Sequence, residues 1–341
     1  MIVLILAGGE GRRLWPLSKD SFPKQFLNFG RTHSLLQTTV LRFINLSVFN
    51  KVVISTNADY VEIVEMQIKE IDLSGFCHII LEPLRKNTTP AIIYSLRYLE
   101  ECFGVNDEEL VLVIPSDHFI EDESLLIDYI EKVSVVARNR IVSFGVKAFK
   151  PDTGYGYIKK SCQFNEWTYE IDRFVEKPSL EKAKEYVSCE DYYWNCGIFI
   201  FSVGVFWEQL KLHDVENYLV SCNSFDFLGD NYVLFNNISI DYSIMEKTEK
   251  SLLCPLNFGW SDIGSWDSIY ELSDKDLNGN AIVGSVKCLE SSRNLFFLVN
   301  GRRVFSVGVE DLLVIDNGND LVIIRRGESQ KLKKLIDCLG S

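Results

Sequence analysis

Short apolar runs alternate with amphipathic segments through the first half of the chain, and no other feature limits the possible folds as much. Five runs lack the polar alternation of a half-exposed strand, so we predict buried parallel strands at Ile2–Leu6, Val52–Ser55, His78–Leu81, Leu110–Ile114 and Ile141–Gly145. Helical spacing lies between them, at Ser34–Ile44, Tyr60–Ile71, Thr89–Cys102 and Leu125–Ala137. Repeated β-α-β units predict an α/β fold with a doubly wound, Rossmann-like sheet that binds ligands at the carboxyl ends of its strands.

The pattern changes twice further along the chain. From Tyr155 to Leu256 it is mixed, with strand-like Glu170–Glu176 and Gly197–Phe201 beside short helices, so we expect a mixed sheet. After about Gly279, Gly, Asn and Asp separate short apolar segments, which predict strands at Asn280–Val286, Leu295–Val299, Arg303–Val307, Leu312–Ile315 and Leu321–Ile324, then a helix at Glu328–Leu339. We therefore predict two domains, residues 1–278 and a small all-β extension at 279–341.

The charge balance excludes some classes of partner. The 341 residues include 35 basic and 48 acidic side chains, a net charge of −13, which argues against nucleic acid or a membrane surface held by bulk electrostatics. Local anion binding stays open, because backbone amides, Lys and Mg²⁺ can override net charge. No run approaches the ~18 apolar residues of a membrane helix, and Met1–Ala7 lacks the basic region of a signal peptide.

The cysteines and histidines indicate a reducing compartment. Nine cysteines, an odd number, contain no C-x-x-C pair, and most lie in apolar surroundings, as buried free thiols do. The four histidines show no metal-ligand spacing. We therefore expect a cytoplasmic protein with inert thiols, and neither disulfides nor a structural zinc site.

A glycine-rich segment follows the first predicted strand directly. Gly8, Gly9 and Gly11 allow a tight turn that brings bare N–H groups against an anion. Arg13 and Lys24 add cationic donors for phosphate oxygens. The spacing matches neither the Walker A motif nor the dinucleotide-binding fingerprint. It predicts a phosphate-binding loop of another type, with an ordinary glycine turn as the alternative.

Further polar residues follow other predicted strands. Glu82 and Asn87 can face a purine edge, although the same block is also a helix start, with Thr88 or Thr89 as the cap. Asp117 ends the fourth strand, where a carboxylate can hold Mg²⁺ or simply cap a loop, and Asp262 is a second carboxylate candidate.

A third group of residues suits a sugar phosphate. Gly156 permits close backbone approach between aromatic residues, and Glu176 can accept hydrogen bonds from sugar hydroxyls. Lys177 can hold the phosphate, and Asn195 supplies an amide for another hydroxyl. A surface ion pair is the alternative for Glu176 and Lys177 taken alone. We interpret Asp241 as a supporting residue, with a helix cap as its alternative.

These motifs together resemble the sugar-phosphate nucleotidylyltransferase family, and within it the bacterial mannose-1-phosphate guanylyltransferases. The resemblance rests on Gly8–Leu17 and Pro23–Leu27, and it continues in order to about Trp266. Two positions depart from the family pattern: Lys86 replaces the usual Arg, and Cys196 replaces Ser or Thr.

The resemblance implies a residue set for each part of the site. It implies catalytic roles for Arg13, Lys24 and Lys177, and a shared Mg²⁺ or other divalent cation on Asp117 and Asp262. The implied nucleotide-binding residues are Leu6, Ala7, Gly8, Gly9, Gly11, Glu82, Lys86, Asn87, Thr88, Ser116 and Asp117. The implied sugar-phosphate-binding residues are Gly156, Tyr157, Glu176, Lys177, Asn195 and Gly197.

The implied activity is transfer of GMP from GTP to α-D-mannose 1-phosphate. Two alternatives stay open: the same chemistry on another pair of sugar phosphate and NTP, or a catalytically silent regulatory subunit that binds GDP-mannose. The resemblance also implies a β-helix-like C-terminal extension used for assembly, and we expect no phosphomannose isomerase activity. Apolar β segments after Gly279 cannot stay exposed to water and must pack against another surface. We therefore expect a homo-oligomer, with a dimer favoured.

Overall fold

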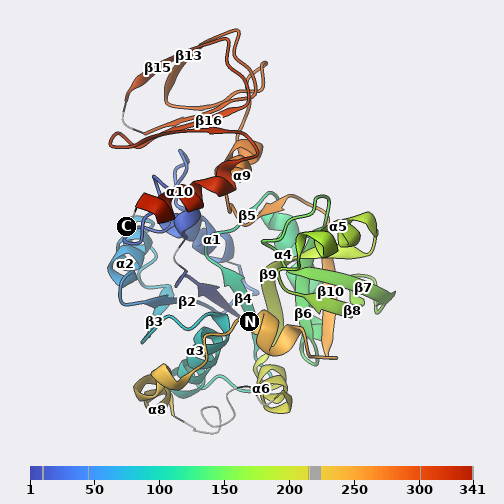
Figure 1. The fold of residues 1–341 in the computed structure, drawn as a ribbon. Helices are drawn as coiled ribbons and strands as arrows, with labels where there is room; N and C mark the ends of the chain where they lie inside the picture. Colours follow the sequence, from blue (N-terminus) through green and yellow to red (C-terminus); the bar gives the residue numbers. More distant parts are fainter. Residues whose placement is uncertain (10, 45, 214, 216–223, 300, 340–341) are drawn as a thin grey trace. The chain divides into compact units, whose positions relative to one another are not determined.

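The computed structural model describes residues 1–9, 11–44, 46–213, 215, 224–299 and 301–339, and its chain forms two compact units (Figure 1). The larger unit comprises Met1–Gly9, Gln37–Ser116 and Ile120–Trp260. The smaller unit comprises Glu10–Leu36, Asp117–Phe119 and Ser261–Ser341. The domain boundary expected after residue 278 stays a prediction, because compact units and domains need not coincide.

A mixed sheet of nine strands runs through the larger unit in the order β3-β2-β1-β4-β9-β6-β10-β8-β7. Its strands are β1 Ile2–Leu6, β2 Lys51–Asn57, β3 Cys77–Glu82, β4 Leu110–Pro115, β6 Ile141–Lys147, β7 Tyr157–Gln163, β8 Tyr169–Val175, β9 Tyr192–Ser202 and β10 Ser251–Leu256. The first four strands are parallel, whereas β9 is antiparallel to both β4 and β6. The five strands expected in the first half are confirmed as strands, and the expected mixed α/β sheet is found. The expected burial was wrong for β3, which lies at the sheet edge and is only partly buried.

Helices flank this sheet, and their starts follow from local capping chemistry (Figure 1). They are α1 Leu35–Phe43, α2 Val61–Glu70, α3 Thr88–Phe103, α4 Glu123–Ala137, α5 Leu180–Ser188, α6 Val203–Leu212 and α8 Phe225–Asp230. The side chains of Asp122, Ser179 and Ser202 accept hydrogen bonds from backbone N–H groups of the first turns of α4, α5 and α6. Within the described ranges, no helix is both long and apolar enough to cross a membrane.

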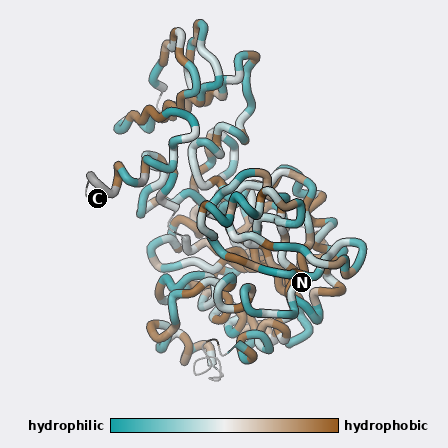
Figure 2. The backbone as a smooth tube through the Cα atoms, turned by 45° about the vertical axis from the view of Figure 1, so that its right-hand side comes forward, coloured by the Kyte–Doolittle hydropathy of each residue, from teal (hydrophilic) through white to brown (hydrophobic). Residues whose placement is uncertain are grey.

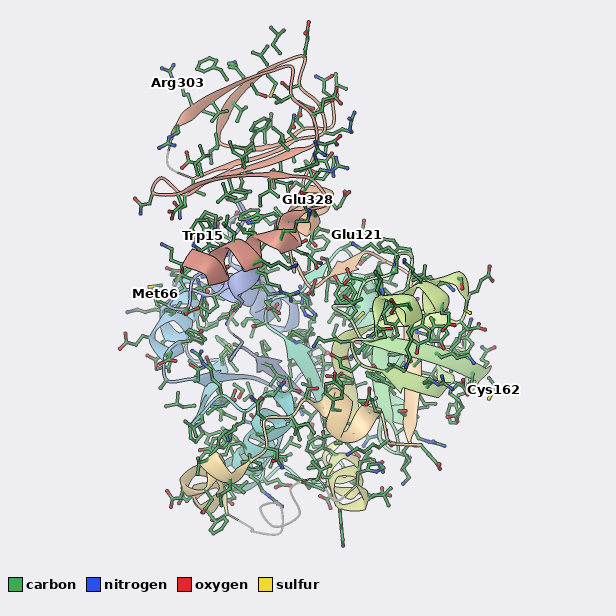
Figure 3. All side chains as sticks on the ribbon, viewed as in Figure 1. Trp15, Met66, Glu121, Cys162, Arg303 and Glu328 are labelled. Atoms are coloured by element: carbon green, nitrogen blue, oxygen red, sulfur yellow. The ribbon has the colours of Figure 1, made fainter. Side chains whose placement is uncertain are left out.

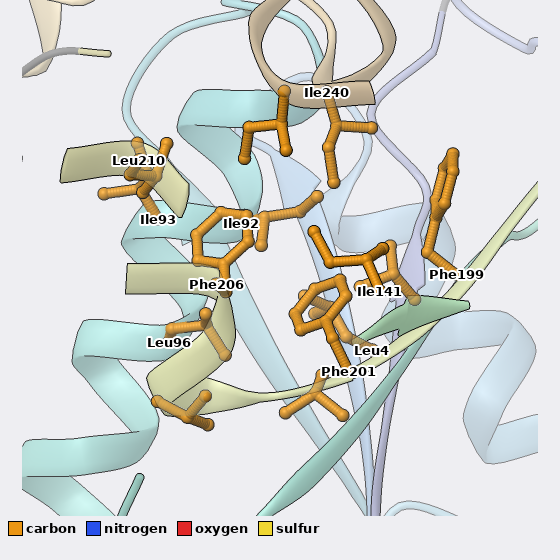
Figure 4. Packing of buried hydrophobic residues seen from close by; sticks show 14 of the residues in the cluster. Leu4, Ile92, Ile93, Leu96, Ile141, Phe199, Phe201, Phe206, Leu210 and Ile240 are labelled. Atoms are coloured by element: carbon orange, nitrogen blue, oxygen red, sulfur yellow. The ribbon is translucent and has the colours of Figure 1, made fainter. Parts of the chain in front are cut away.

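One hydrophobic core of the larger unit lies between the sheet and helices α3 and α6. Leu4, Ile141 and Phe201 from the strands pack against Ile92 of α3 and Phe206 of α6 (Figure 4). Apolar stretches of backbone run through the middle of this unit (Figure 2). Burial of these strands explains why they lack polar alternation in the sequence. The strand ends that carry the predicted site therefore have a rigid support.

Two groups of short strands form the C-terminal part of the smaller unit. Strands β12 Ala281–Val283, β14 Leu295–Leu298, β16 Leu312–Asp316 and β17 Leu321–Arg325 form one sheet, and β13 Ser285–Leu289 pairs with β15 Arg303–Val307. All neighbours except β16 and β17 are parallel. The prediction of a single strand at Asn280–Val286 was wrong, because the segment contains parts of two strands. The backbone turns at Gly284, where φ is 105°, so β12 and β13 join different sheets.

The N-terminal motif packs with this β region inside the smaller unit. Leu14 and Ile263 share a buried cluster with Leu295 and Leu313. The indole N–H of Trp266, in α9 Trp266–Leu272, donates to the carbonyl of Trp15 at 2.9 Å, and Trp15 is labelled in Figure 3. The short helices η5 Ser329–Lys331 and α10 Leu332–Leu339 end the described chain. Segments far apart in sequence thus form one core.

Candidate active site

Two cations and two carboxylates of the predicted site lie together in the smaller unit. The ammonium of Lys24 is 3.0 Å from Asp117 Oδ2, and it donates to the carbonyl oxygen of Asp262. The guanidinium of Arg13 is 3.4 Å from Asp262 Oδ2. Lys24 is only 7% exposed, so its charge requires these partners. Four residues from three distant segments therefore form one charged cluster.

Local backbone geometry holds the Asp262 segment in place. Ile263 has φ of 47°, a left-handed conformation that is rare for a β-branched residue. Its buried side chain belongs to the core of the smaller unit, which offsets the strain. The N–H of Gly264 donates to Asp262 Oδ1 at 3.0 Å. Strain of this kind typically occurs at functional sites, where packing overrides local preference.

The donor set of this cluster fits Mg²⁺. Magnesium is usually held by one or two carboxylates, while phosphates and water fill its other positions. Among the residues that the structure describes, no group of three or more His, Cys, Asp and Glu side chains is arranged to hold a metal ion. A divalent cation held by Asp117 and Asp262 therefore stays a prediction.

Gly8, the first glycine of the glycine-rich segment, belongs to the larger unit and lies beside the buried carboxyl group of Glu82. Asn57 Nδ2 donates to the carbonyl of Gly8 at 3.2 Å. The Glu82 carboxyl accepts from Ser55 Oγ at 2.7 Å and from the hydroxyl of Tyr232 at 3.4 Å. Burial raises the pKa of Glu82 to about 7, although the bonds from Ser55 and Tyr232 oppose this shift.

Sequence reasoning missed three of these partners. Ser55 and Asn57 lie at the carboxyl end of β2, so the rule that ligands bind at strand ends could have identified them. Tyr232 lies in the short helix η3 Tyr232–Leu234, and nothing in its local sequence indicates contact with Glu82.

Glu82→Gln is expected to remove a pH dependence of stability. Because the folded pKa is about 7 and the ordinary value is 4.5, the unfolded chain loses this proton first as pH rises. The wild-type protein therefore loses stability between roughly pH 4.5 and 7, by about 3 kcal/mol in total. Urea unfolding of both proteins on either side of this window measures the difference, and a pH-independent difference would contradict the expectation.

The block after Glu82 anchors a distant segment. Asn87 caps α3, since its Oδ1 accepts from the N–H of Thr88 at 2.9 Å, so the expected cap at Thr88 or Thr89 was wrong. Thr88 Oγ1 instead accepts from the N–H of Ile240 at 2.9 Å, and the Thr89 and Ser243 hydroxyls bond at 2.8 Å.

Other residues expected to bind the nucleotide form hydrogen bonds within the protein. Lys86 Nζ donates to a backbone carbonyl of η3 at 2.9 Å. The N–H of Ala7 donates to the carbonyl of Ser55, and the N–H of Ser116 to the carbonyl of Leu6. These bonds set the exit of β1, the position from which the glycine-rich loop starts.

The residues expected to bind the sugar phosphate lie in the larger unit, where they contact one another. Lys177 Nζ is 2.8 Å from Glu176 Oε1, and Lys177 itself has φ of 45°. Asn195 Nδ2 donates to Asp241 Oδ1 at 2.8 Å, and its Oδ1 accepts from the N–H of Gly197 at 3.0 Å. The N–H of Asn195 donates to the carbonyl of Gly156 at 2.8 Å. Asp241 is thus a direct partner of Asn195 as well as the first residue of a turn.

The charges of this group are mutually coupled. Burial first, and then the nearby Glu176 carboxylate, raise the pKa of Asp241 to about 7, while Lys177 opposes the shift. Partial burial alone would lower the pKa of Lys177, but its ion pair with Glu176 outweighs this, so the pKa is raised. Lys177 therefore stays cationic at neutral pH.

Two residues near this group, Tyr157 and Cys196, have buried side chains, so only their backbone atoms can contact a ligand. The Tyr157 ring is buried, and its hydroxyl donates to the carbonyl of Asp152 at 2.9 Å. Cys196 is fully buried, and burial raises the pKa of its thiol well above the ordinary value. Replacement of Ser or Thr by Cys therefore adds no reactive group here.

Comparison with known proteins shows the family to which the chain belongs. Residues 2–279 match the family model described as Nucleotidyl transferase. The chain is 36% identical over 354 residues to the alginate biosynthesis protein AlgA of Pseudomonas syringae pv. tomato, covering 100% of this chain and 72% of that protein. It is also 36% identical over 358 residues to mannose-1-phosphate guanylyltransferase 2 of Escherichia coli O157:H7, covering 99% and 73%.

A solved structure has a similar fold along the whole chain. It comes from Thermus thermophilus, is described as a mannose-1-phosphate geranyltransferase, and is 26% identical to this chain. The TM-score is 0.84, and the match covers 99% of both chains.

Proposed function

Because the chain belongs to the nucleotidyl transferase family, in its mannose-1-phosphate guanylyltransferase branch, we propose a specific use of the two residue groups described above. The enzyme transfers GMP from GTP to mannose 1-phosphate and releases pyrophosphate and GDP-mannose. The observation that carries this proposal is the charged cluster of Arg13, Lys24, Asp117 and Asp262 in a chain whose relatives bear that name.

The chemistry requires positioning more than proton transfer. The sugar phosphate is already an oxyanion, so it can attack the α-phosphorus in line, without a general base. Two anions must approach each other, and the protein therefore has to neutralise charge. A divalent cation held by Asp117 and Asp262 would supply part of that neutralisation.

Each residue group has a role in this scheme. Arg13, Lys24 and the amides of the glycine-rich loop bind the triphosphate and stabilise the leaving pyrophosphate. Lys177 aligns the phosphate of the sugar, and the Glu176 carboxylate and the Asn195 amide bind sugar hydroxyls. Glu82 and Asn87 stand on the nucleotide side, where Glu82 supports the loop at Gly8.

The proposal is tested by measuring pyrophosphate release from each NTP, with and without each of several sugar 1-phosphates. We expect turnover only with GTP and mannose 1-phosphate together. Turnover with another pair would support the alternative substrates, and binding of GDP-mannose without turnover would support a regulatory subunit.

Lys24→Met and Lys177→Ala are expected to impair the use of different substrates. Hydrogen bonds to charged groups contribute about 1.5–3 kcal/mol, so each loss corresponds to about 10- to 100-fold in kcat/KM. Lys177→Ala raises the KM for mannose 1-phosphate, whereas Lys24→Met impairs the use of GTP. Steady-state kinetics with each substrate varied separately measures this, and reversed defects would contradict the role assignment.

Lys24→Met has a second expected effect, because its ammonium competes with any metal ion for Asp117. The variant should therefore bind Mn²⁺ more tightly than the wild-type protein in the absence of nucleotide, as measured by electron paramagnetic resonance. Lys19→Met, which removes an exposed charge from the same segment, is the matched control.

The C-terminal strands complete the proposal. Successive parallel strands β12, β14 and β16, with β13 and β15 between them in sequence, support a β-helix-like extension. Exposed Leu289, Phe305 and Val307 on β13 and β15 support its use in a homo-oligomer, with a dimer favoured, which sedimentation would test. A cytoplasmic location is part of the same proposal.

A further inference from the structure

A carboxylate outside the residue sets above contacts the backbone of the sugar-phosphate group. Glu246 Oε1 accepts a hydrogen bond from the backbone N–H of Glu176 at 2.8 Å. The two residues lie 70 positions apart, so tertiary structure alone brings them together. A bond from a backbone N–H to a carboxylate is charge-assisted and stronger than a neutral one.

The bond lies at a backbone position that needs support. Strand β8 ends at Val175, and its last register partner in β7 is Tyr157. Glu176 is the first residue beyond the strand, and Lys177 then takes a left-handed conformation with φ of 45°. That conformation is unfavourable for a residue with a Cβ. A bond to the preceding N–H can offset this cost and fix the direction in which Lys177 leaves the strand.

Glu246 also belongs to the turn that holds the other half of the same group. It directly follows η4, a π-helical turn at Asp241–Met245, and its own N–H donates to the carbonyl of Asp241 at 2.9 Å. Asp241 in turn accepts from Asn195 Nδ2 at 2.8 Å. One turn therefore contacts Asn195 through its first residue and Glu176 through the residue that follows it. Single π-helical turns frequently occur at functional sites.

We propose that Glu246 is a positioning residue for the sugar phosphate: it holds the Glu176–Lys177 backbone so that Lys177 meets the phosphate. The inference rests on the proposed function, because it takes Lys177 as the phosphate ligand. Glu246 touches no substrate in this scheme and acts only through the backbone of Glu176.

Charge and position predict opposite effects for Glu246, which makes the inference testable. A carboxylate near a phosphate site repels a dianionic substrate, so loss of its charge alone would improve binding. Loss of the hydrogen bond would instead weaken binding, because Lys177 would no longer be held. Glu246→Gln removes the charge but keeps an acceptor oxygen, whereas Glu246→Ala removes both.

The experiment compares Glu246→Ala, Glu246→Gln and the wild-type protein, with Glu249→Ala as a matched control that removes an exposed carboxylate three residues away. We expect Glu246→Ala to raise the KM for mannose 1-phosphate about 10-fold, which corresponds to loss of one hydrogen bond to a charged group. The KM for GTP and kcat should stay close to wild type. Glu249→Ala should keep the wild-type KM for mannose 1-phosphate, and Glu246→Gln, which loses the charge but keeps the acceptor, should keep it or lower it.

Hydrogen exchange of the Glu176 amide gives a readout that does not depend on activity. We expect faster exchange in Glu246→Ala and wild-type protection in Glu246→Gln. An unchanged KM for mannose 1-phosphate in Glu246→Ala, or an equal defect in the Gln variant, would overturn the positioning role. Wild-type protein that does not use mannose 1-phosphate at all would instead overturn the proposed function, and the exchange result would still decide whether Glu246 holds this backbone.

Discussion

Asp117→Asn and Asp262→Asn are each expected to lower kcat about 1,000-fold, equivalent to about 4 kcal/mol of transition-state stabilisation. An amide is a poor ligand for a hard divalent cation, so either change removes one of the two carboxylates available to it. Each change also leaves a neighbouring cation less neutralised, Lys24 in the first case and Arg13 in the second. Pyrophosphate release under saturating substrates measures the loss.

The fold should survive both changes. In Asp117→Asn, Lys24 still has the carbonyl of Asp262 and the oxygen of the introduced amide as acceptors, so we expect stability to fall by only about 1 kcal/mol. Asp274→Asn, which alters an exposed carboxylate of the same unit, is the control and should behave as wild type. Near-native Mg²⁺-dependent turnover in either Asp117→Asn or Asp262→Asn would refute the shared-metal assignment.

Gly11→Ala is expected to give the second large defect, at least about 100-fold in kcat/KM for GTP. Gly11 has φ of 53°, and an added Cβ would lie 2.8 Å from the backbone N of Lys24 and 2.9 Å from its Cγ. Because the nearest atom belongs to backbone, the Lys24 segment has to move, and the ammonium then leaves Asp117. Kinetics with GTP varied measures the effect.

A matched variant separates this displacement from backbone strain. Gly104 ends α3 with φ of 63°, and an added Cβ there meets nothing within 4 Å. Gly104→Ala therefore carries the same left-handed strain, roughly 1–2 kcal/mol of stability, but should keep full activity. If Gly11→Ala and Gly104→Ala had equal activity, contact between the loop and Lys24 would not be needed for catalysis.

Charge pairing within the site could not be read from the sequence. The motifs identified Arg13, Lys24, Asp117 and Asp262 as separate candidates, but not that Lys24 pairs with Asp117 and Arg13 with Asp262. Such pairing depends on distances between segments up to 249 residues apart. The raised pKa of Glu82 was likewise hidden, because it follows from burial beside Gly8 and Tyr232.

The sequence by itself determined the elements and their order, because burial and periodicity are local properties. An unbroken apolar run such as Ile2–Leu6 has no polar side chain to expose, so it could only become the buried strand β1, with the bounds expected. A turn inside an apolar run was harder to predict from the sequence, because two short strands and one long strand have the same composition. The turn at Gly284 between β12 and β13 is the example.

Only the tertiary structure decided which polar groups meet. Asn87 rather than a threonine caps α3 because the Thr88 and Thr89 hydroxyls are bound by the segment around Ile240. Glu246 reaches the backbone of Glu176 because η4 places it there, not because of any local signal. Hydrogen bonds and ion pairs act over about 3 Å, so their partners are set by the packing of the whole chain rather than by neighbours in sequence.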